Sequence, residues 1–398
     1  MMSSLRRATT SPVTHAIGNY EVVRKLATGG MGEVYLAKQR GPVAFSRDVV
    51  LKKLHSSYTN DAQFVEMFLN EAQISANLTH PNIIHIYELF EEGDGYVLAM
   101  EYVRGGTALS LLKACAAAGK ALPIGPAVRI AIAVCEALHY AYNTPDEQGL
   151  PRKVIHRDIS PSNVLVGYDG HVKLADFGVA KTLDMNATRG TTVKGKYGYM
   201  SPEQVRCQPL DQRSDLFALG IVLWEMTTGR ALFKRDNEAG MVYALVEEPI
   251  PLPSERVADY PPDLENIVMK ALSRPREERY ESALEMANEL RRVAHDNGWD
   301  IEAPALSSLV RDTVQDDQVA FGKIGGSDAF SSGLGKRRIR TTTTGGDWDA
   351  GGSYGSLSIE TPVPSAAPRQ SRRDLVVTTL VMLVLSAVFW TLIVPQLV

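Results

Sequence analysis

Cysteine is scarce in this chain of 398 residues, which contains only Cys115, Cys135 and Cys207. Neither their number nor their spacing suits a disulfide framework or a zinc site, so we expect reduced thiols in an intracellular protein. Cys115 and Cys135 lie in stretches rich in alanine and leucine, where a cysteine behaves as a small buried apolar side chain. The scarcity argues against a secreted domain held together by disulfides.

A strong excess of charge of one sign is also missing. The 42 Lys and Arg residues nearly balance the 46 Asp and Glu residues, which leaves a formal net charge of −4. Because the chain has no general basic field, we expect no nucleic acid among its partners. Hydrophobic residues (44%) and charged residues (22%) have shares usual in globular proteins, and 398 residues are enough for a large domain and an extension.

Long apolar runs are missing from the start of the chain. Residues 1–19 contain two arginines but no apolar stretch, so we expect no secretory signal peptide and a cytoplasmic N-terminus. One long run stands at residues 375–394, where twenty uncharged residues are enough for about 30 Å of helix and one bilayer crossing. A buried core helix is the alternative, but the run is apolar on every face. Arg372 and Arg373 precede it and predict that this side stays in the cytoplasm.

The most informative polar stretch is HRDISPSN, residues 156–163. It places an acid (Asp158), an arginine (Arg157) and an amide (Asn163) at fixed offsets in a short loop between two apolar runs. Such flanking runs predict strands that hold the loop. Taken alone, the stretch favours a catalytic loop, and a structural ion pair is the alternative.

Further motifs stand in order around this loop. Residues 20–40 alternate β-branched and aromatic residues around a glycine cluster, which predicts strand, turn and strand. DVVLK at 48–52 predicts another strand, and DFG at 176–178 and SPE at 201–203 follow the loop. The ordered set resembles the protein-kinase signature of glycine-rich loop, strand lysine, catalytic loop, DFG and APE-like end. GGMGEVY, HPNI and SPEQ make it most similar to the eukaryotic-like serine/threonine kinases of bacteria.

The resemblance covers about residues 20–294 and implies an α+β, two-lobed protein-kinase fold with a small β-rich N-lobe and a larger helical C-lobe. We expect an N-terminal leader over 1–19 and a kinase domain over 20–294. A disordered, flexible tether is expected over 295–371, because Gly, Ser, Thr, Asp and Pro dominate there and cannot bury a core. The basic patch at 336–340 is either a solvated charge run or an attraction to anionic lipid.

In the resemblance, the glycine-rich loop covers the phosphates of ATP, since backbone N–H groups must approach an anion without Cβ atoms in the way. The first glycine of the pattern is Ala27 here. The hinge is expected within 96–103, with Met100 at the back of the adenine pocket and the backbone of Glu101 and Val103 at the adenine edge. The implied ATP-binding residues are Leu26, Ala27, Thr28, Gly29, Gly30, Met31, Gly32, Val34, Lys52, Met100, Glu101, Val103 and Leu165.

Lys52 is implied to be the lysine that contacts the phosphates, and Lys53 is the alternative as a solvated neighbour. Apolar residues at steps of three and four predict a helix over 64–78. Glu71 on this helix matches the glutamate that pairs with the strand lysine. Glu66 is the second choice, because the HPNI run that follows favours the register of Glu71.

The resemblance also assigns the chemistry. Asp158 would accept the proton of a substrate hydroxyl, and Asn163 and Asp176 would hold Mg²⁺ on the phosphates of ATP. Asp215 is implied to orient the backbone of the catalytic loop, and Arg279 to pair with Glu203. Phosphoryl transfer needs positioning and charge neutralisation more than covalent help, which explains oxygen ligands beside cationic donors.

Two positions depart from the family pattern. Ser160 stands where serine/threonine kinases usually carry a lysine two residues past the aspartate, and Lys196, after Gly195, stands where they usually carry a threonine. These positions are neighbours in the family fold, so we expect Lys196 to act as a catalytic residue that supplies the missing ammonium. The alternative is that Lys196 is a solvated loop residue.

We therefore expect an ATP- and Mg²⁺-dependent serine/threonine protein kinase that phosphorylates proteins, including itself. It would be a single-pass protein of the inner membrane with a cytoplasmic kinase domain, and with no external sensor after residue 394. A membrane-tethered pseudokinase that only binds nucleotide is the alternative, but such a scaffold needs neither the base nor both metal ligands. Because Arg157 needs an anionic partner, autophosphorylation is expected at Thr188, Thr191 or Thr192 rather than at Thr182.

Overall fold

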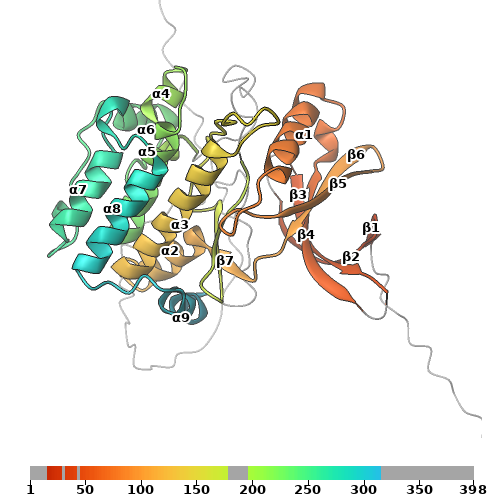
Figure 1. Ribbon diagram of the computed structural model, residues 1–398, viewed down its shortest axis with the longest axis horizontal. Coiled ribbons are helices and arrows are strands. Elements are labelled where there is room, and N and C mark those ends of the chain that lie inside the picture. Colours follow the sequence, from red (N-terminus) through yellow and green to blue (C-terminus); the bar gives the residue numbers. More distant parts are fainter. Residues whose placement is uncertain (1–15, 29–31, 43–44, 178–195, 315–398) are drawn as a thin grey trace, which may run out of the picture. The chain divides into compact units, whose positions relative to one another are not determined.

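The computed structural model describes residues 16–28, 32–42, 45–177 and 196–314 (Figure 1). Its N-terminal part is a six-stranded antiparallel sheet with the strand order β1-β2-β3-β4-β6-β5. The two predicted strands are present as β2 and β3, and the predicted turn between them lies outside the described residues. The strands are β1 (Ala16–Ile17), β2 (Tyr20–Thr28), β3 (Gly32–Arg40), β4 (Ser46–Leu54), β5 (Ile86–Glu92) and β6 (Gly95–Glu101).

The last residues of the expected leader (1–19) take part in the sheet. Ile17 pairs with Tyr20 in the register of β1 and β2 and is 1% exposed. Because burial of the isoleucine side chain away from water lowers the free energy of the folded protein, this residue joins the sheet.

The two faces of the sheet bury different side chains, as the period of two requires. Val50 and Met100 belong to an apolar cluster that includes Phe68 and Ala72 of the helix α1 (Ala62–Ala76). Val49 and the other alternate residues of the central strands form a separate cluster on the opposite face. Helix α1 is the predicted helix, and Asp61 caps its N-terminus by accepting a hydrogen bond from the Gln63 N–H at 3.1 Å.

The C-terminal part is helical and surrounds α5, in which every residue from Ser214 to Thr228 is buried. Within the described residues, one helix, α3, is long and apolar enough to cross a membrane, but 72% of its apolar stretch is buried inside the protein, so it is a core helix. The helices are α2 (Ala108–Ala117), α3 (Ile124–Asn143), α4 (Pro202–Val205), α5 (Arg213–Thr228), α6 (Glu238–Val246), α7 (Pro262–Ala271), α8 (Ala283–Asp296) and α9 (Ala303–Thr313). Short 3-10 turns are η1 (Ser56–Tyr58), η3 (Lys196–Tyr199), η4 (Pro253–Glu255) and η5 (Arg276–Glu278).

A small three-stranded sheet connects these parts. It has the order β7-β8-β9, with β7 (Gly105–Thr107), β8 (Val164–Gly167) and β9 (Val172–Leu174). The Leu174 carbonyl accepts a hydrogen bond from the Ile84 N–H at 2.9 Å, just before β5. The strand that leads into the DFG motif is therefore tied to the N-terminal sheet.

The tether prediction is wrong over 295–314. Helix α8 continues to Asp296, and α9 follows it with Leu306 and Val310 fully buried. The composition of this segment is polar, but its few apolar residues recur at four-residue steps and so form one apolar helix face. The remainder of the predicted tether (315–371) and the predicted membrane helix (375–394) lie outside the described residues.

Candidate active site

The catalytic loop lies between α3 and β8, and its backbone is fixed by Asp215 of α5. The Asp215 carboxylate accepts hydrogen bonds from the His156 N–H at 2.7 Å and the Arg157 N–H at 2.8 Å. Burial raises the pKa of Asp215 to about 7, although these N–H donors and the Arg157 charge lower it. The expected support of the loop by Asp215 is thus present as a pair of buried hydrogen bonds.

Two site residues have left-handed backbones. Arg157 has a φ of 66° and Asp176 has a φ of 58°, a backbone region that residues other than glycine rarely adopt. The Arg157 carbonyl accepts a hydrogen bond from Gln204 Nε2 at 3.0 Å, and the Asp176 carboxylate accepts one from Lys52 at 3.0 Å. Strained residues of this kind cluster at functional sites, where surrounding contacts hold them.

Asp158 and Asn163 face one another across the loop. The Asn163 amide nitrogen donates to the Asp158 carbonyl at 2.8 Å and to its carboxylate Oδ2 at 3.0 Å. The backbone carbonyl of Asn163 accepts a hydrogen bond at 2.9 Å from the N–H of Ala175, the residue before Asp176. The arrangement assigns the amide nitrogen to Asp158 and leaves the oxygen Oδ1 as the atom suited to a metal.

Lys52 of β4 forms a buried ion pair with two carboxylates. Its Nζ lies 2.6 Å from Glu71 Oε1 and 3.0 Å from Asp176 Oδ1, and its side chain is 6% exposed. Burial alone lowers the pKa of Lys52, but the Asp176 and Glu71 charges outweigh this and hold the pKa above its usual value. Lys52 is therefore a permanent cation, and the partner in the structure is Glu71 rather than Glu66.

Four of the residues expected to bind ATP belong to one apolar cluster, namely Ala27, Val34, Met100 and Leu165. Leu26 and Val103 pack against this cluster. Thr28 ends β2 with an exposed side chain, and Gly32 begins β3. Gly29, Gly30 and Met31 lie outside the described residues. The cluster members from the expected site and its surroundings are Ala27, Val34, Val50, Met100, Leu165 and Ala175.

The expected hinge is held by contacts of Glu101 that the sequence analysis missed. The Glu101 N–H donates to the His85 carbonyl at 2.9 Å, and the Glu101 carboxylate pairs with Lys173 Nζ at 2.9 Å. Lys173 lies on β9, immediately before the DFG motif. Its position three residues before Asp176 was the available signal, but no pattern in the sequence links it to Glu101.

The Lys196 prediction concerns a residue whose backbone opens η3 but whose side chain lies outside the described residues. At the other departure, Ser160 Oγ lies 2.9 Å from Ser162 Oγ, so the serine hydroxyl has a local partner in the loop. The expected phosphorylation sites Thr182, Thr188, Thr191 and Thr192 also lie outside the described residues.

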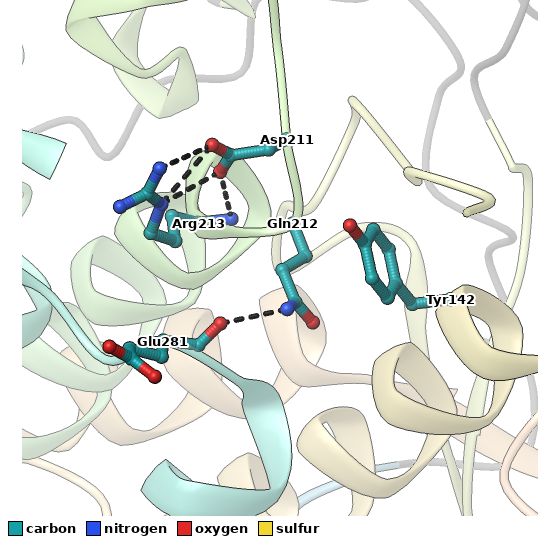
Figure 2. Close-up of a pocket in the computed structure, with 5 residues that line it drawn as sticks. All are labelled: Tyr142, Asp211, Gln212, Arg213 and Glu281. Atoms are coloured by element: carbon teal, nitrogen blue, oxygen red, sulfur yellow. Dashed lines mark hydrogen bonds and ion pairs between the residues drawn. The ribbon is translucent and has the colours of Figure 1, made fainter. Parts of the chain in front are cut away.

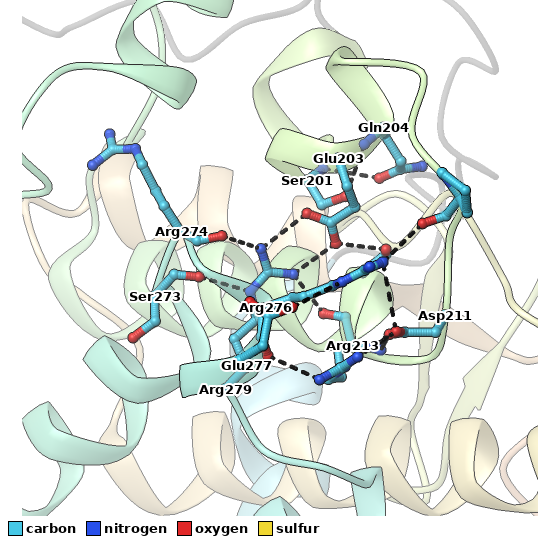
Figure 3. A network of polar contacts seen from close by, with 12 residues as sticks. Ser201, Glu203, Gln204, Asp211, Arg213, Ser273, Arg274, Arg276, Glu277 and Arg279 are labelled. Carbon is cyan, nitrogen blue, oxygen red and sulfur yellow. Dashed lines mark hydrogen bonds and ion pairs between the residues drawn. The ribbon is translucent and has the colours of Figure 1, made fainter. Parts of the chain in front are cut away.

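By the resemblance, the stretch from DFG to SPE, residues 176–203, is the activation segment. A buried ion pair anchors its end (Figure 3). Arg279 Nη1 and Nη2 donate to the two oxygens of Glu203 at 2.7 and 2.9 Å. Ser214 Oγ donates to the same carboxylate at 2.6 Å. Burial raises the pKa of Glu203, but these donors and the Arg279 charge together outweigh burial and hold the pKa below its usual value, so the carboxylate is ionised. The bidentate contact is the strong form of an ion pair.

A surface hollow of about 240 Å³ lies elsewhere, between the end of α3 and the start of α5 (Figure 2). Gln212 Nε2 donates to the Glu281 carbonyl at 2.7 Å, and Asp211 pairs with Arg213 at 2.7 Å. The Gln212 contact joins the start of α5 to the segment before α8, whereas the Asp211–Arg213 pair is local to the start of α5. They make the hollow part of the scaffold rather than of the site.

A sheet-rich lobe and a helical lobe that meet at a Lys52–carboxylate pair and an HRD loop define the protein kinase class. Comparison with known families agrees, because the protein kinase domain model matches residues 20–290. The chain belongs to the protein kinase family, as the resemblance implied.

Curated relatives are bacterial kinases. The tyrosine-protein kinase MasK of Myxococcus xanthus is 42% identical over 71% of this chain and 45% of its own length. The serine/threonine-protein kinase PrkC of Bacillus subtilis is 34% identical over 76% of this chain and 43% of its own length. The serine/threonine-protein kinase PknB of Mycobacterium tuberculosis is 35% identical over 75% of this chain and 46% of its own length. The chain thus spans less than half the length of these relatives.

A solved structure supports the fold. The kinase domain of PknI from Mycobacterium tuberculosis is 27% identical, with a TM-score of 0.55 over 71% of this chain and 98% of that chain.

Proposed function

We propose that this protein is an ATP- and Mg²⁺-dependent protein kinase that phosphorylates serine and threonine hydroxyls. The observation that carries the proposal is Lys52 Nζ held between Glu71 at 2.6 Å and Asp176 at 3.0 Å, beside the Asp158–Asn163 contact. This set combines a buried cation, a base and two metal-suited oxygens in one place. The bacterial kinases among its relatives support the same activity.

The residues fit a bound nucleotide. The apolar cluster beneath the hinge suits an adenine ring, and Lys52 next to it suits phosphate oxygens. Asp176 and Asn163 would hold Mg²⁺, which prefers one or two such oxygens together with phosphate and water. When bound, the metal neutralises charge on the phosphates.

The remaining steps belong to the protein. Lys52 would orient the phosphates, because Glu71 and Asp176 fix its ammonium from two sides. Asp158 would accept the proton of the substrate hydroxyl, and the Asn163 amide fixes its carboxylate for that task. Asp215 keeps the loop backbone in place while the proton moves.

A nucleotide-binding scaffold without transfer is the other function considered, and the geometry does not favour it. A scaffold needs the adenine pocket and Lys52 but has no use for Asp158 held against Asn163.

Tyrosine is the competing acceptor hydroxyl. Ser160 replaces the lysine usual in serine/threonine kinases, and MasK, whose name states tyrosine as its acceptor, is 42% identical. We still favour serine and threonine, because PrkC and PknB, named for those acceptors, retain 34% and 35% identity over a larger share of this chain.

Two finer points also belong to the proposal. We infer that residues 375–394 anchor the protein in the inner membrane with the kinase domain in the cytoplasm, supported by their apolar composition and the arginines before them. We also infer autophosphorylation at Thr188, Thr191 or Thr192, supported by Arg157, a half-buried cation that suits a phosphate.

The test is incubation of the purified protein with Mg-ATP, followed by identification of the phosphorylated amino acids. We expect phosphoserine and phosphothreonine, with sites between Gly178 and Ser201. Phosphotyrosine alone would transfer the assignment to the tyrosine class. If nucleotide binds but no phosphate is transferred to any protein, the scaffold function replaces the kinase.

A further inference from the structure

The segment of residues 301–314 lies beyond the matched kinase domain, which ends at residue 290, yet it is built into the protein. Leu306 and Val310 are fully buried, and Val314 is 4% exposed. The Ile301 carbonyl accepts a hydrogen bond from Arg129 Nη1 at 2.8 Å. We call residues 301–314 the C-terminal strap.

The strap lies against the small sheet that follows the hinge. Ser307 Oγ donates to the Tyr168 carbonyl at 2.6 Å, and the Tyr168 hydroxyl donates to the Val314 carbonyl at 3.3 Å. Tyr168 comes directly after β8, and its N–H donates to the carbonyl of Arg104, the residue after Val103 of the hinge. Through Tyr168, the strap is therefore linked to Arg104, the residue directly after the hinge.

The backbone is shaped to receive the strap. A Cβ atom at Gly106 of β7 would stand 3.1 Å from Val314 Cγ1. Gly170, in the turn between β8 and β9, has a φ of +79°, and a Cβ there would stand 2.1 Å from the Ala303 carbonyl oxygen. Arg129 Nε also donates to the Gly170 carbonyl at 3.1 Å, so one guanidinium holds both the turn and the strap.

The small sheet connects this contact to the nucleotide pocket. Gly106 pairs with Val166, and Thr107 pairs with Leu165, whose side chain belongs to the apolar cluster of the adenine pocket. A displacement of β7 would thus move both the chain after Val103 and the position of Leu165.

We propose that the C-terminal strap is a positioning element of the nucleotide site, with Ser307, Val314 and Tyr168 as its positioning residues. It holds β7 and β8 so that the hinge backbone and Leu165 meet the adenine in register. The inference rests on the proposed function, since it assigns the strap to an ATP pocket. The competing account is that the strap only stabilises the helical lobe.

Two neighbouring serines allow a matched test in the full-length protein. Ser307→Ala removes the hydrogen bond to Tyr168, whereas Ser308→Ala changes an exposed hydroxyl on the same helix. Val314→Ala removes methyl groups that lie near Gly106, and Val314→Ile keeps an apolar side chain of similar shape. Tyr168→Phe deletes the hydroxyl that donates to Val314 and keeps the ring.

The measurements are the Kd for Mg-ADP, the KM for ATP, kcat and the urea midpoint. We expect Ser307→Ala, Tyr168→Phe and Val314→Ala each to raise Kd and KM about two- to tenfold, the range of one lost contact. We expect kcat to change by less than about twofold, with Ser308→Ala and Val314→Ile close to the parent protein.

Two results separate the inference from the function on which it rests. If the parent binds Mg-ADP and the variants lower the urea midpoint without changing Kd, the strap is only structural and the inference is wrong. If the parent itself binds no nucleotide, the proposed function falls as well. Tyr168→Phe, the smallest change, decides the matter should Val314→Ala fail to fold.

Discussion

The exchange between positions 160 and 196 gives the sharpest prediction for single residues. If Lys196 supplies the ammonium absent at Ser160, Lys196→Ala removes one charge-assisted contact to phosphate, worth roughly 1.5–3 kcal/mol. At about 1.4 kcal/mol per factor of ten, turnover should fall about ten- to a hundredfold. Steady-state phosphorylation of a protein substrate measures the effect.

Two companion variants test the charge rather than the position. Lys196→Thr should be as damaging as Lys196→Ala, because it adds a hydroxyl without a cation. Ser160→Lys combined with Lys196→Thr should recover activity, because it rebuilds the usual family pair. A Lys196→Ala protein with the turnover of the parent would remove Lys196 from the mechanism.

Glu225 gives a prediction about pH. Burial raises its pKa to about 7, against hydrogen bonds from Tyr199 and the Leu232 N–H that lower it. A carboxyl with a raised folded-state pKa binds its proton more tightly in the folded than in the unfolded protein. Its contribution to the free energy of unfolding is therefore complete below about pH 4 and is lost as the pH rises through about 7. The glutamine in Glu225→Gln cannot ionise. Between pH 6 and pH 8 we therefore expect the unfolding free energy of the parent to decrease by about 1 kcal/mol more than that of the variant.

Urea unfolding at both pH values measures this difference, with Glu238→Gln, an exposed change on α6, as the control. Equal pH slopes for the parent and Glu225→Gln would show that Glu225 is ionised throughout that range.

The sequence predicted some residues and missed others for physical reasons. Lys52, Glu71, Asp158 and Asn163 lie in short motifs with fixed offsets, and the structure places them within hydrogen-bond contact in two groups. The ion pair of Lys173 and Glu101 joins residues on separate strands, and no sequence pattern around either residue predicts the other as its partner. Such partners depend on the packing of whole elements.

Between elements, the Glu203–Arg279 pair makes the strongest prediction about stability. The Arg279 side chain is 0% exposed and the Glu203 side chain 4%. Arg279→Ala leaves a buried carboxylate without its cation, which typically costs about 3–5 kcal/mol of unfolding free energy. Urea unfolding of the protein measures the cost.

Arg276→Ala is the matched control. Arg276 lies in η5 next to Arg279, and its side chain is 36% exposed in its contact with Asp211 at 3.8 Å. An ion pair at this exposure contributes about 0–1 kcal/mol. Should Arg279→Ala be no more destabilising than Arg276→Ala, the buried pair is not an anchor of the activation segment.

Strands and helices with strong periodicity were predictable, and α9 was not. The strands around the glycine cluster and helix α1 follow clear patterns, because one face of each is buried. Helix α9 has only Leu306 and Val310 fully buried in a segment that composition assigns to a tether. Composition averages over both faces of a helix, so a narrow apolar face is lost in it.

For the whole molecule, membrane attachment is the prediction that reaches furthest. Deleting residues 372–398 should move the protein from the vesicle pellet to the supernatant in sedimentation, because the expected anchor is removed. Replacing the basic residues at 336–340 with glutamine serves as the control. Attachment through that patch would weaken at high salt, whereas a membrane helix would not. A truncated protein that is folded and still pelleted with vesicles would contradict the anchor.

The central claim is that the site transfers phosphate, and Asp158→Asn tests it most directly. Asparagine keeps the shape of the side chain but cannot accept the hydroxyl proton, and a positioned base contributes typically about 10²- to 10⁴-fold. The measurement is phosphate transfer from Mg-ATP to protein alongside the Kd for Mg-ATP, with Asp263→Asn, exposed on α7, as the control. We predict a loss of transfer of that size, with the Kd changed by less than about threefold. Transfer by Asp158→Asn at the rate of the parent, or a parent that binds Mg-ATP and transfers nothing, would contradict the claim.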